Sequence, residues 1–246
     1  MTSRRWHRPS AFACALTVVG VAGFTGLGHW QIERKAEKEQ LLAAFANAPS
    51  STTLNLADVL NTADPSRYPH VRTAGNFLAD RGYLFDEQFH GGQPGVRVLA
   101  VFASDADTRL LLVDRGWIAW NHATGTMPLI PSIPTEKTQL TGIYAPFPGS
   151  GIRVGGNPLP SQTAWPKLTL HVDATEITAD LGKRVLPRIL LLDLDSSSGF
   201  VREWTPSVMP PERHMAYAVT WFTFAAICVL IFIVRHWRKV DKATNE

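Results

Sequence analysis

The sequence predicts a membrane protein in which two transmembrane helices flank a mainly antiparallel β (α+β) extramembrane domain. Two uncharged runs of twenty residues, 11–30 and 215–234, lie near the ends of the 246-residue chain. At about 1.5 Å per residue, each run is long enough to cross a hydrocarbon layer about 30 Å thick. Between them, short runs of branched and aromatic residues alternate with Gly and Pro, which is typical of strands joined by turns.

The first apolar run, 11–30, follows an N-terminal segment, 1–10, that carries three arginines. A cleaved signal peptide would have a shorter apolar core and a small-x-small cleavage site directly after it. This run ends instead in Gly-His-Trp-Gln, which favours an uncleaved membrane anchor. Residues 31–46 suit a helix that continues the anchor as a polar stalk, and the stretch from Pro49 onward is expected to break it.

Seven segments of the middle region are predicted to be strands: 68–73, 82–89, 96–103, 109–118, 139–144, 167–172 and 188–194. Turn-forming residues at 104–108 join the third and fourth segments and predict a β-hairpin. A short helical turn is expected at 54–60, and a second helix from Asp173 as N-cap to Gly182 as its stop. The domain is therefore expected to be a mainly antiparallel barrel or sandwich with one or two helices.

The second apolar run, 215–234, is followed by a basic tail, 235–246, and has Tyr217 and Trp221 near its other end. The arginines of both runs lie on the sides that face the chain termini, so the positive-inside rule places both termini in the cytoplasm. The 184 residues from 31 to 214 then form a periplasmic domain. We expect a multi-pass protein of the bacterial inner membrane.

The charge distribution separates the ends of the chain from its middle. The net charge is +3, from 24 basic and 21 acidic residues, but seven of the basic residues lie in 1–8 and 235–242. Outside the two tails, 17 basic and 19 acidic residues remain. The positive charge therefore belongs to membrane flanks and offers no surface for nucleic acid. Cys14 and Cys228 are the only cysteines and both lie in the apolar runs, so the region of the chain between these runs has no disulfide and no thiolate metal site.

The sequence contains no recognisable catalytic motif: G-x-S-x-G, H-E-x-x-H and G-x-x-x-x-G-K-[ST] are all absent. On a strand, Asp193 and Asp195 would lie on the same face, as a catalytic acid–base pair requires. A solvent-exposed strand face explains the two carboxylates equally well without catalysis and is the favoured interpretation. In Arg115-Gly116-Trp117, the glycine indicates close backbone approach or a bulge, and the Trp is expected to cover the core. We therefore predict that the protein is not an enzyme.

His214 lies at the aromatic end of the second run, where an imidazole can ligate the iron of a cofactor that partitions into lipid. His29 ends the first run, so both imidazoles are expected at nearly the same depth. Packed helices have axes about 8–10 Å apart, a gap that two such side chains can bridge to a shared iron. The alternative is a structural place at the interface for each histidine, with His29 beside Trp30.

Four segments together resemble the family of cytochrome c oxidase biogenesis proteins called surfeit locus protein one. They are LGHWQIER at 27–34, VRTAGNF at 71–77, LVDRGWI at 112–118 and HMAYAVTWF at 214–222. The resemblance implies two spans around a non-cytoplasmic domain and a role in maturing haem–copper oxidase. Bacterial members of the family are linked to haem a, so the resemblance also implies haem a as cofactor. The family's histidine in the second span corresponds to His214, which is then the expected axial ligand of the haem iron.

With this resemblance, the predicted function is a non-enzymatic assembly factor that holds or presents haem a to the oxidase catalytic subunit. The expected cofactor-binding residues are His214, His29, Tyr217 and Trp221. The expected partners are the catalytic subunit of the haem–copper oxidase, haem a synthase and the lipid bilayer. The alternative is a membrane-tethered periplasmic scaffold that binds oxidase subunits without binding haem.

Overall fold

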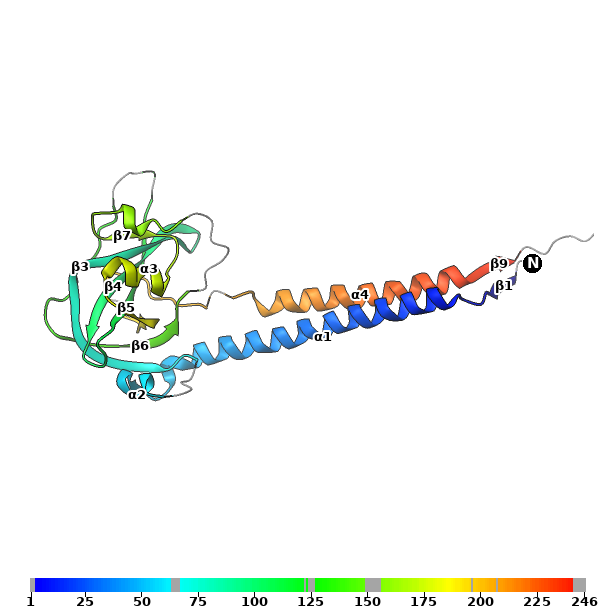
Figure 1. Ribbon diagram of the computed structural model, residues 1–246, viewed down its shortest axis with the longest axis horizontal. Coiled ribbons are helices and arrows are strands. Elements are labelled where there is room, and N and C mark those ends of the chain that lie inside the picture. The colour runs from blue at the N-terminus through cyan, green and yellow to red at the C-terminus, as the bar shows by residue number, and fades with distance from the viewer. Residues whose placement is uncertain are drawn as a thin grey trace, which may run out of the picture. The chain divides into compact units, whose positions relative to one another are not determined.

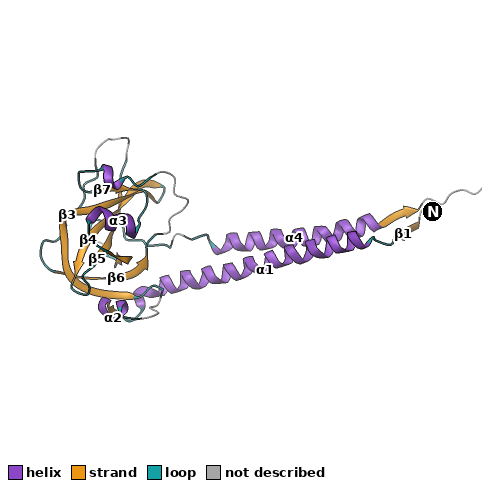
Figure 2. Cartoon of the chain, viewed as in Figure 1, coloured by secondary structure: helices purple, strands orange, loops and turns teal. Residues whose placement is uncertain are grey.

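The computed structural model describes residues 3–62, 67–121, 123, 127–148, 156–195, 197–206 and 208–240. The chain forms two compact units, one from Met1–Leu42 with Val208–Glu246 and the other from Ala43–Ser207. The first unit is a pair of long helices that run side by side, and the second is a domain built mainly of strands (Figure 1; Figure 2).

The helical unit contains α1 (Ala11–Asn47), whose last turn lies in the other unit, and α4 (Pro211–His236). Beyond their ends, β1 (Ser3–Trp6) pairs with β9 (Trp237–Val240) in an antiparallel ribbon. Both helices are long and apolar enough to cross a membrane. The 37 residues of α1 cover the predicted anchor and stalk without a break, over about 55 Å.

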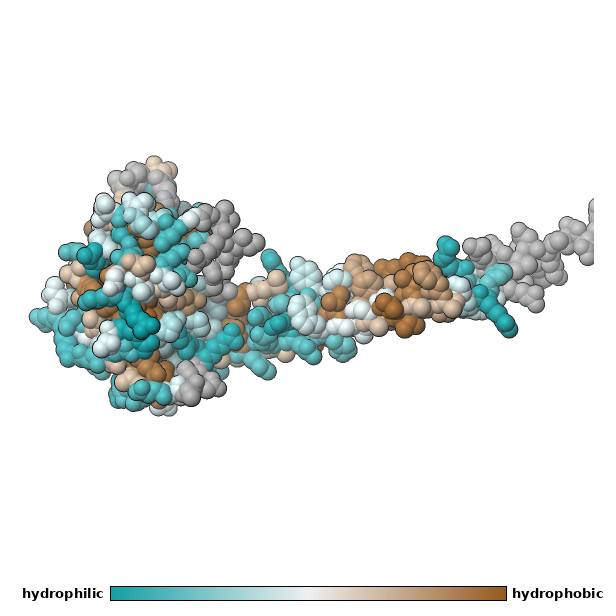
Figure 3. All heavy atoms as spheres, viewed as in Figure 1, coloured by the Kyte–Doolittle hydropathy of each residue, from teal (hydrophilic) through white to brown (hydrophobic). Residues whose placement is uncertain are grey.

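Apolar surface gathers on one stretch of the helix pair, toward β1 and β9 (Figure 3). The remaining stretch of the two helices is mainly white to teal in the same view, which means intermediate to hydrophilic residues. In the sequence, the change from apolar to polar falls after residue 30 in α1 and before residue 215 in α4. The helix pair therefore has an apolar band and a polar end, as expected for an anchor that continues as a stalk.

The domain contains one mixed sheet with two small helices. Its strands are β2 (Leu54–Asn55), β3 (His70–His90), β4 (Gln93–Ser104), β5 (Leu110–Ala119), β6 (Thr138–Pro146), β7 (Lys167–Thr169) and β8 (Val185–Leu192). Its helices are α2 (Leu56–Leu60) and α3 (Ala174–Leu181), with 3₁₀ turns at Ala48–Ser50 and Leu159–Ser161.

Five of these strands close into a barrel in the order β3, β4, β5, β8, β6 and back to β3. Within this ring, β5 and β8 pair in parallel, and the other four pairs are antiparallel. The prediction of a mainly antiparallel sheet was wrong, because β8 is parallel to β5 and the short strands β2 and β7 are parallel to β3. A closed ring of five strands cannot alternate in direction all the way round, so at least one neighbouring pair has to be parallel.

The predicted strands 68–73 and 82–89 form one long strand, β3, and not two. Its pairing with β4 shifts register between Phe77 and Gly82 and again between Phe85 and Gln88. Asp80 and Glu87 have positive φ in these irregular stretches. Such bulges bend a strand without ending it, and this bend lets β3 pair with both β4 and β6. The polar and glycine residues that suggested a turn therefore mark a bend.

Other predictions for the domain are confirmed. β4 and β5 form the predicted hairpin. The side chain of Asp173 accepts hydrogen bonds from the N–H groups of Thr175 and Glu176 at the start of α3, and Gly182 ends the helix in the left-handed conformation. Strand β5 contributes alternate residues to two buried clusters, with Leu112 in the cluster that contains Ile177 and Leu111 in the cluster that contains Leu56. Both faces of β5 are therefore covered.

Candidate functional site

The two long helices pack in an antiparallel register that is set by small residues and aromatic rings. A Cβ atom on Gly28 would lie 2.7 Å from two ring atoms of Phe222, so α1 approaches α4 closely at this point. One level along the pair, Phe24 stacks on Trp221 with ring centroids 5.8 Å apart. Close helix contact through a residue without a side chain is typical of membrane helix pairs.

This register brings His214 of α4 to Gln31 of α1. The His214 Nδ1 atom lies 2.7 Å from the Gln31 Oε1 atom, and both residues are buried, at 8% and 9% exposure. A carboxamide oxygen is only an acceptor, so Nδ1 carries the proton and donates it to Gln31. In the neutral form of the ring, the lone pair is then on Nε2.

The Nε2 atom of His214 is buried and has no hydrogen-bond partner among the described residues. A buried polar atom without a partner is destabilising by about 1–3 kcal/mol, and nearly all such atoms in folded proteins are satisfied. The lone pair of a neutral imidazole is also the group that binds a transition metal or a haem iron. The residues present therefore fit an axial iron ligand at Nε2.

The other residues expected at the site are placed differently. His29 is exposed, and its ring meets Phe222 edge-on with centroids 5.9 Å apart. Tyr217 is 48% exposed, whereas Trp221 packs against Phe24 of α1. The structure thus brings His214 together with Gln31 and places His29 on another side of α1, since two residues along a helix turn through about 200°.

Gln31 is the residue that the sequence analysis missed. It lies directly after the first apolar run, inside the segment 27–34 that supported the family resemblance. The available signal was the position of Gln31. If two apolar runs of equal length pack antiparallel, the residue that follows the first run lies near the residue that precedes the second run, and these residues are Gln31 and His214. An exposed polar residue at the start of a stalk has the same appearance in the sequence, so the position alone did not single it out.

The Arg115-Gly116-Trp117 segment of β5 has a structural use in the domain. Gly116 has a φ of +127°, and a Cβ atom there would lie 2.6 Å from Cβ of Phe200 and 2.8 Å from the backbone oxygen of Val201. Trp117 and Val201 exchange backbone hydrogen bonds of 2.8 and 2.9 Å. The indole N–H of Trp117 donates to the backbone oxygen of Gln88 at 2.9 Å. The glycine therefore allows the chain after β8 to pair with β5.

The charged residues beside this segment are also tied to the domain. Arg115 donates to the backbone oxygens of Pro131 and Ser132, each at 2.8 Å. Burial, with a smaller effect from the charge of Arg202, lowers the pKa of Arg115 to about 10. Asp114 is 1% exposed and forms an ion pair with Arg97, and burial raises the pKa of its carboxyl against the attraction of that arginine. Arg115 therefore holds the segment around Pro131 and Ser132, and the ion pair of Asp114 with Arg97 joins β5 to β4.

The carboxylates Asp193 and Asp195 do not form a pair on one strand face, because β8 ends at Leu192. Asp193 accepts a hydrogen bond from Nε2 of His70 at 2.9 Å, and Asp195 accepts from Ser197 at 2.6 Å. Nδ1 of His70 lies 2.8 Å from the Thr53 hydroxyl. Each carboxylate is thus used in a separate contact, and the described part of the chain holds no cluster of three or more metal-ligating His, Cys, Asp or Glu residues.

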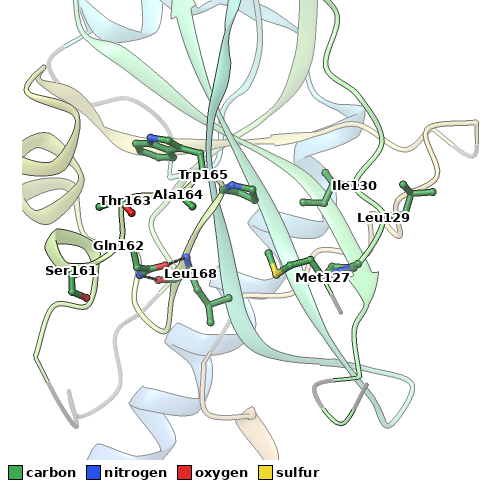
Figure 4. A pocket seen from close by; sticks show the side chains of 11 residues that line it. Met127, Leu129, Ile130, Ser161, Gln162, Thr163, Ala164, Trp165 and Leu168 are labelled. Atoms are coloured by element: carbon green, nitrogen blue, oxygen red, sulfur yellow. Dashed lines mark hydrogen bonds between the residues drawn. The ribbon is translucent and has the colours of Figure 1, made fainter. Parts of the chain in front are cut away.

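The domain also has a groove of about 850 Å³ between the segments 127–130 and 161–168 (Figure 4). Its lining is mainly apolar and has no titratable side chain: Met127, Pro128, Leu129, Ile130, Ser161, Gln162, Thr163, Ala164, Trp165, Pro166 and Leu168. The Gln162 side chain holds both backbone groups of Leu168, at 2.7 and 2.8 Å. This groove offers apolar surface for binding and no group for proton transfer.

Comparison with known proteins gives one consistent result. A model described as the SURF1 family matches residues 18–226. A SURF1-like protein of Monosiga brevicollis is 26% identical over 237 residues, covering 89% of this chain and 85% of that protein. SURF1-like proteins of Rickettsia conorii and Rickettsia felis are 24% and 27% identical and cover 87% and 85% of this chain, with 88% and 89% of their own lengths matched.

Proposed function

Because the chain belongs to the SURF1 family, whose members are oxidase assembly factors, we propose that it holds haem a for delivery to the catalytic subunit of a haem–copper oxidase. The observation that carries the proposal is the buried Nε2 atom of His214, which has no partner among the described residues. A haem iron offers a coordination position that a histidine lone pair can fill. His214 would be the axial ligand, and the helix pair would hold it.

The chain's own residues have three tasks in this proposal. His214 supplies the Nε2 lone pair, and Gln31 keeps the proton on Nδ1. Trp221, packed on Phe24, holds α4 against α1 about two helical turns from the histidine. Since Nε2 is covered in the structure, the side chains over it have to move before an iron can reach it. Loading is therefore expected to need a local opening at the polar end of the helix pair.

We place α1 and α4 in the bacterial inner membrane, with both chain termini cytoplasmic and the domain periplasmic. The support is the length and composition of the two helices, together with arginines at their terminal flanks. His214 and Gln31 then lie where the apolar band ends on the periplasmic side. A cofactor with an apolar ring system and polar propionates fits this boundary, because one part of it favours lipid and the other favours water.

The proposal assigns the iron to His214 alone among the residues of these two helices, since His29 is exposed and directed at Phe222. It also describes a carrier and not an enzyme. The titratable groups of the domain considered above are engaged in ion pairs or hydrogen bonds, and the groove lining has none. The proposed partners are the oxidase catalytic subunit and haem a synthase.

Purification of the full-length protein from a bacterium that makes haem a tests the function directly. We expect the purified protein to show the absorption spectrum of bound haem a, with no more than about one haem for each chain. A parallel preparation from a host that makes only haem b tests whether the site selects the haem. Protein that is pure, folded and without haem from the first host would contradict the carrier function.

A second function, a scaffold that binds oxidase subunits without haem, is favoured by the groove. Leu129 is 95% exposed and Met127 is 52% exposed in the same groove lining, so both offer apolar surface to a partner. Leu129→Asp is expected to reduce co-purification of oxidase subunits and to leave the haem spectrum unchanged. Leu194→Asp, at a site 81% exposed and outside the groove, is the matched control.

A further inference from the structure

We propose that Gln31 is a positioning residue for His214, which fixes the tautomer and ring orientation that present Nε2 as the ligating atom. This inference rests on the proposed function for its consequences toward haem, but its structural part concerns the unloaded chain alone. The observation is one short hydrogen bond, 2.7 Å between Nδ1 and Oε1, that joins two buried residues on different helices.

The bond determines where the proton of the imidazole resides. A neutral histidine in water exchanges its proton between the two nitrogens, and in this site only Nδ1 has an acceptor among the described residues. A proton on Nε2 would bury a donor without an acceptor, and the Gln31 amide would have to turn over to present its NH2 group to Nδ1. The Nδ1–H tautomer is therefore favoured, and it is the tautomer that leaves Nε2 ready for a metal.

The bond also limits rotation of the ring. Rotation about χ2 of His214 would move Nδ1 away from Gln31 and leave both atoms buried without a partner. Because Gln31 is held on the helix opposite, the direction of the Nε2 lone pair depends on the packing of α1 against α4. The close contact of Gly28 with Phe222 lies about one turn of α1 from Gln31 and sets that packing.

The chemistry of the acceptor is suited to a carrier. A carboxylate that accepts from Nδ1 increases the basicity of a ligating histidine more than a neutral amide does. An amide fixes the ring in the same way with a smaller gain in iron affinity, and it adds no charge at the edge of the membrane. A protein that passes its haem onward has to release it, so a neutral acceptor at position 31 supports holding and release together.

The first test uses the full-length protein without haem, in lipid nanodiscs and with ¹⁵N-labelled histidine. The ¹⁵N spectrum is expected to show His214 as a single Nδ1–H tautomer. Gln31→Leu, which keeps the volume but removes the acceptor, is expected to give a mixture of tautomers. Gln40→Leu, at an exposed position of the same helix, is the control and is expected to match the parent. An unchanged His214 tautomer in Gln31→Leu would overturn the inference.

The second test measures haem a affinity for the same variants by titration. Loss of a hydrogen-bond partner of a metal-ligating histidine weakens metal binding about 10–100-fold, and we expect a loss in this range for Gln31→Leu. Gln31→Glu is expected to bind more tightly and to shift the reduction potential of the bound haem downward. Parent-like affinity and potential in both variants would overturn the positioning role.

The two tests separate this inference from the proposed function. If His214→Ala loses haem while Gln31→Leu keeps full affinity, the carrier function stands and the role of Gln31 is wrong. If His214→Ala binds haem as well as the parent does, the proposed site is wrong, and the tautomer measurement alone then decides what Gln31 does in the unloaded chain.

Discussion

Gln31 and His214 are 183 positions apart in the chain, yet the side-chain oxygen of the first lies 2.7 Å from Nδ1 of the second. The contact forms because α1 and α4 run antiparallel with equal apolar stretches, so the residues at the ends of these stretches meet. Its consequence is an imidazole that is fixed at one nitrogen and free at the other.

The helix contact next to this pair predicts a packing defect in Gly28→Val. The new side chain would overlap the Phe222 ring, since a Cβ atom alone would lie 2.7 Å from it. Overpacking of this kind is destabilising by about 1–3 kcal/mol, and we expect a lower unfolding temperature of the protein in detergent. Gly26→Val is the matched control, because nothing lies within 4 Å of its Cβ position. Equal unfolding temperatures would contradict the register described for the two helices.

Trp117→Ala is predicted to act through folding of the domain. Removal of a packed aromatic side chain is destabilising by about 3–5 kcal/mol, which is enough to unfold a marginally stable domain. We expect low protein levels in cells and no specific change in haem binding per folded molecule. Trp117→Phe keeps an aromatic ring but loses the indole N–H that donates to Gln88, and we expect loss of that hydrogen bond to cost about 1 kcal/mol. Normal protein levels with lost oxidase activity would indicate instead a direct contact of Trp117 with a partner.

The turn between β4 and β5 predicts a pH effect on the domain. Hydrogen bonds from Arg109 lower the pKa of Asp107 to about 2, below its ordinary value of 3.8. Because the folded-state pKa is the lower one, this pair favours the folded state above about pH 4, and the contribution is lost as the pH falls toward 2. A carboxyl NMR titration measures it. Arg109→Gln is expected to return the Asp107 pKa to about 4, and an unchanged pKa in that variant would contradict the assignment.

The topology predicts where reporters fused to the chain are active. A periplasmic reporter inserted at position 149 is expected to be active, and one fused to the C-terminus is expected to be inactive, because the arginine flanks predict that both termini are cytoplasmic. A cytoplasmic reporter is expected to give the opposite pattern. Activity of the cytoplasmic reporter at position 149 would show that the orientation is the reverse of the predicted one, with His214 on the cytoplasmic side of the membrane.

Local features of the fold were predictable because they depend on neighbouring residues. The two apolar helices, the β4–β5 hairpin and the Asp173 cap each have a signal within a few positions. The parallel pairing of β5 with β8 was not predictable in this way, since it follows from closing a ring of five strands. Strand β3 was split in the prediction because a bulge and a turn have similar composition.

The candidate site was predictable in part for the same reason. His214 was identifiable from its position at the end of an apolar run and from the family resemblance. Its partner depends on the relative register of two helices that are far apart in the sequence, and an error of two residues replaces Gln31 by His29. Such a small difference turns the side chain through about 200° around α1, from His214 in the case of Gln31 to Phe222 in the case of His29, so the register had to come from the structure.

The central claim is that Nε2 of His214 binds the iron of haem a. The most direct measurement is the absorption spectrum of His214→Ala, purified at full length from a host that makes haem a, with His29→Ala and His236→Ala prepared in parallel. We predict that His214→Ala is inserted at the parent level but retains no haem a, whereas the other two variants keep the parent spectrum. Full retention of haem a by His214→Ala would contradict the claim.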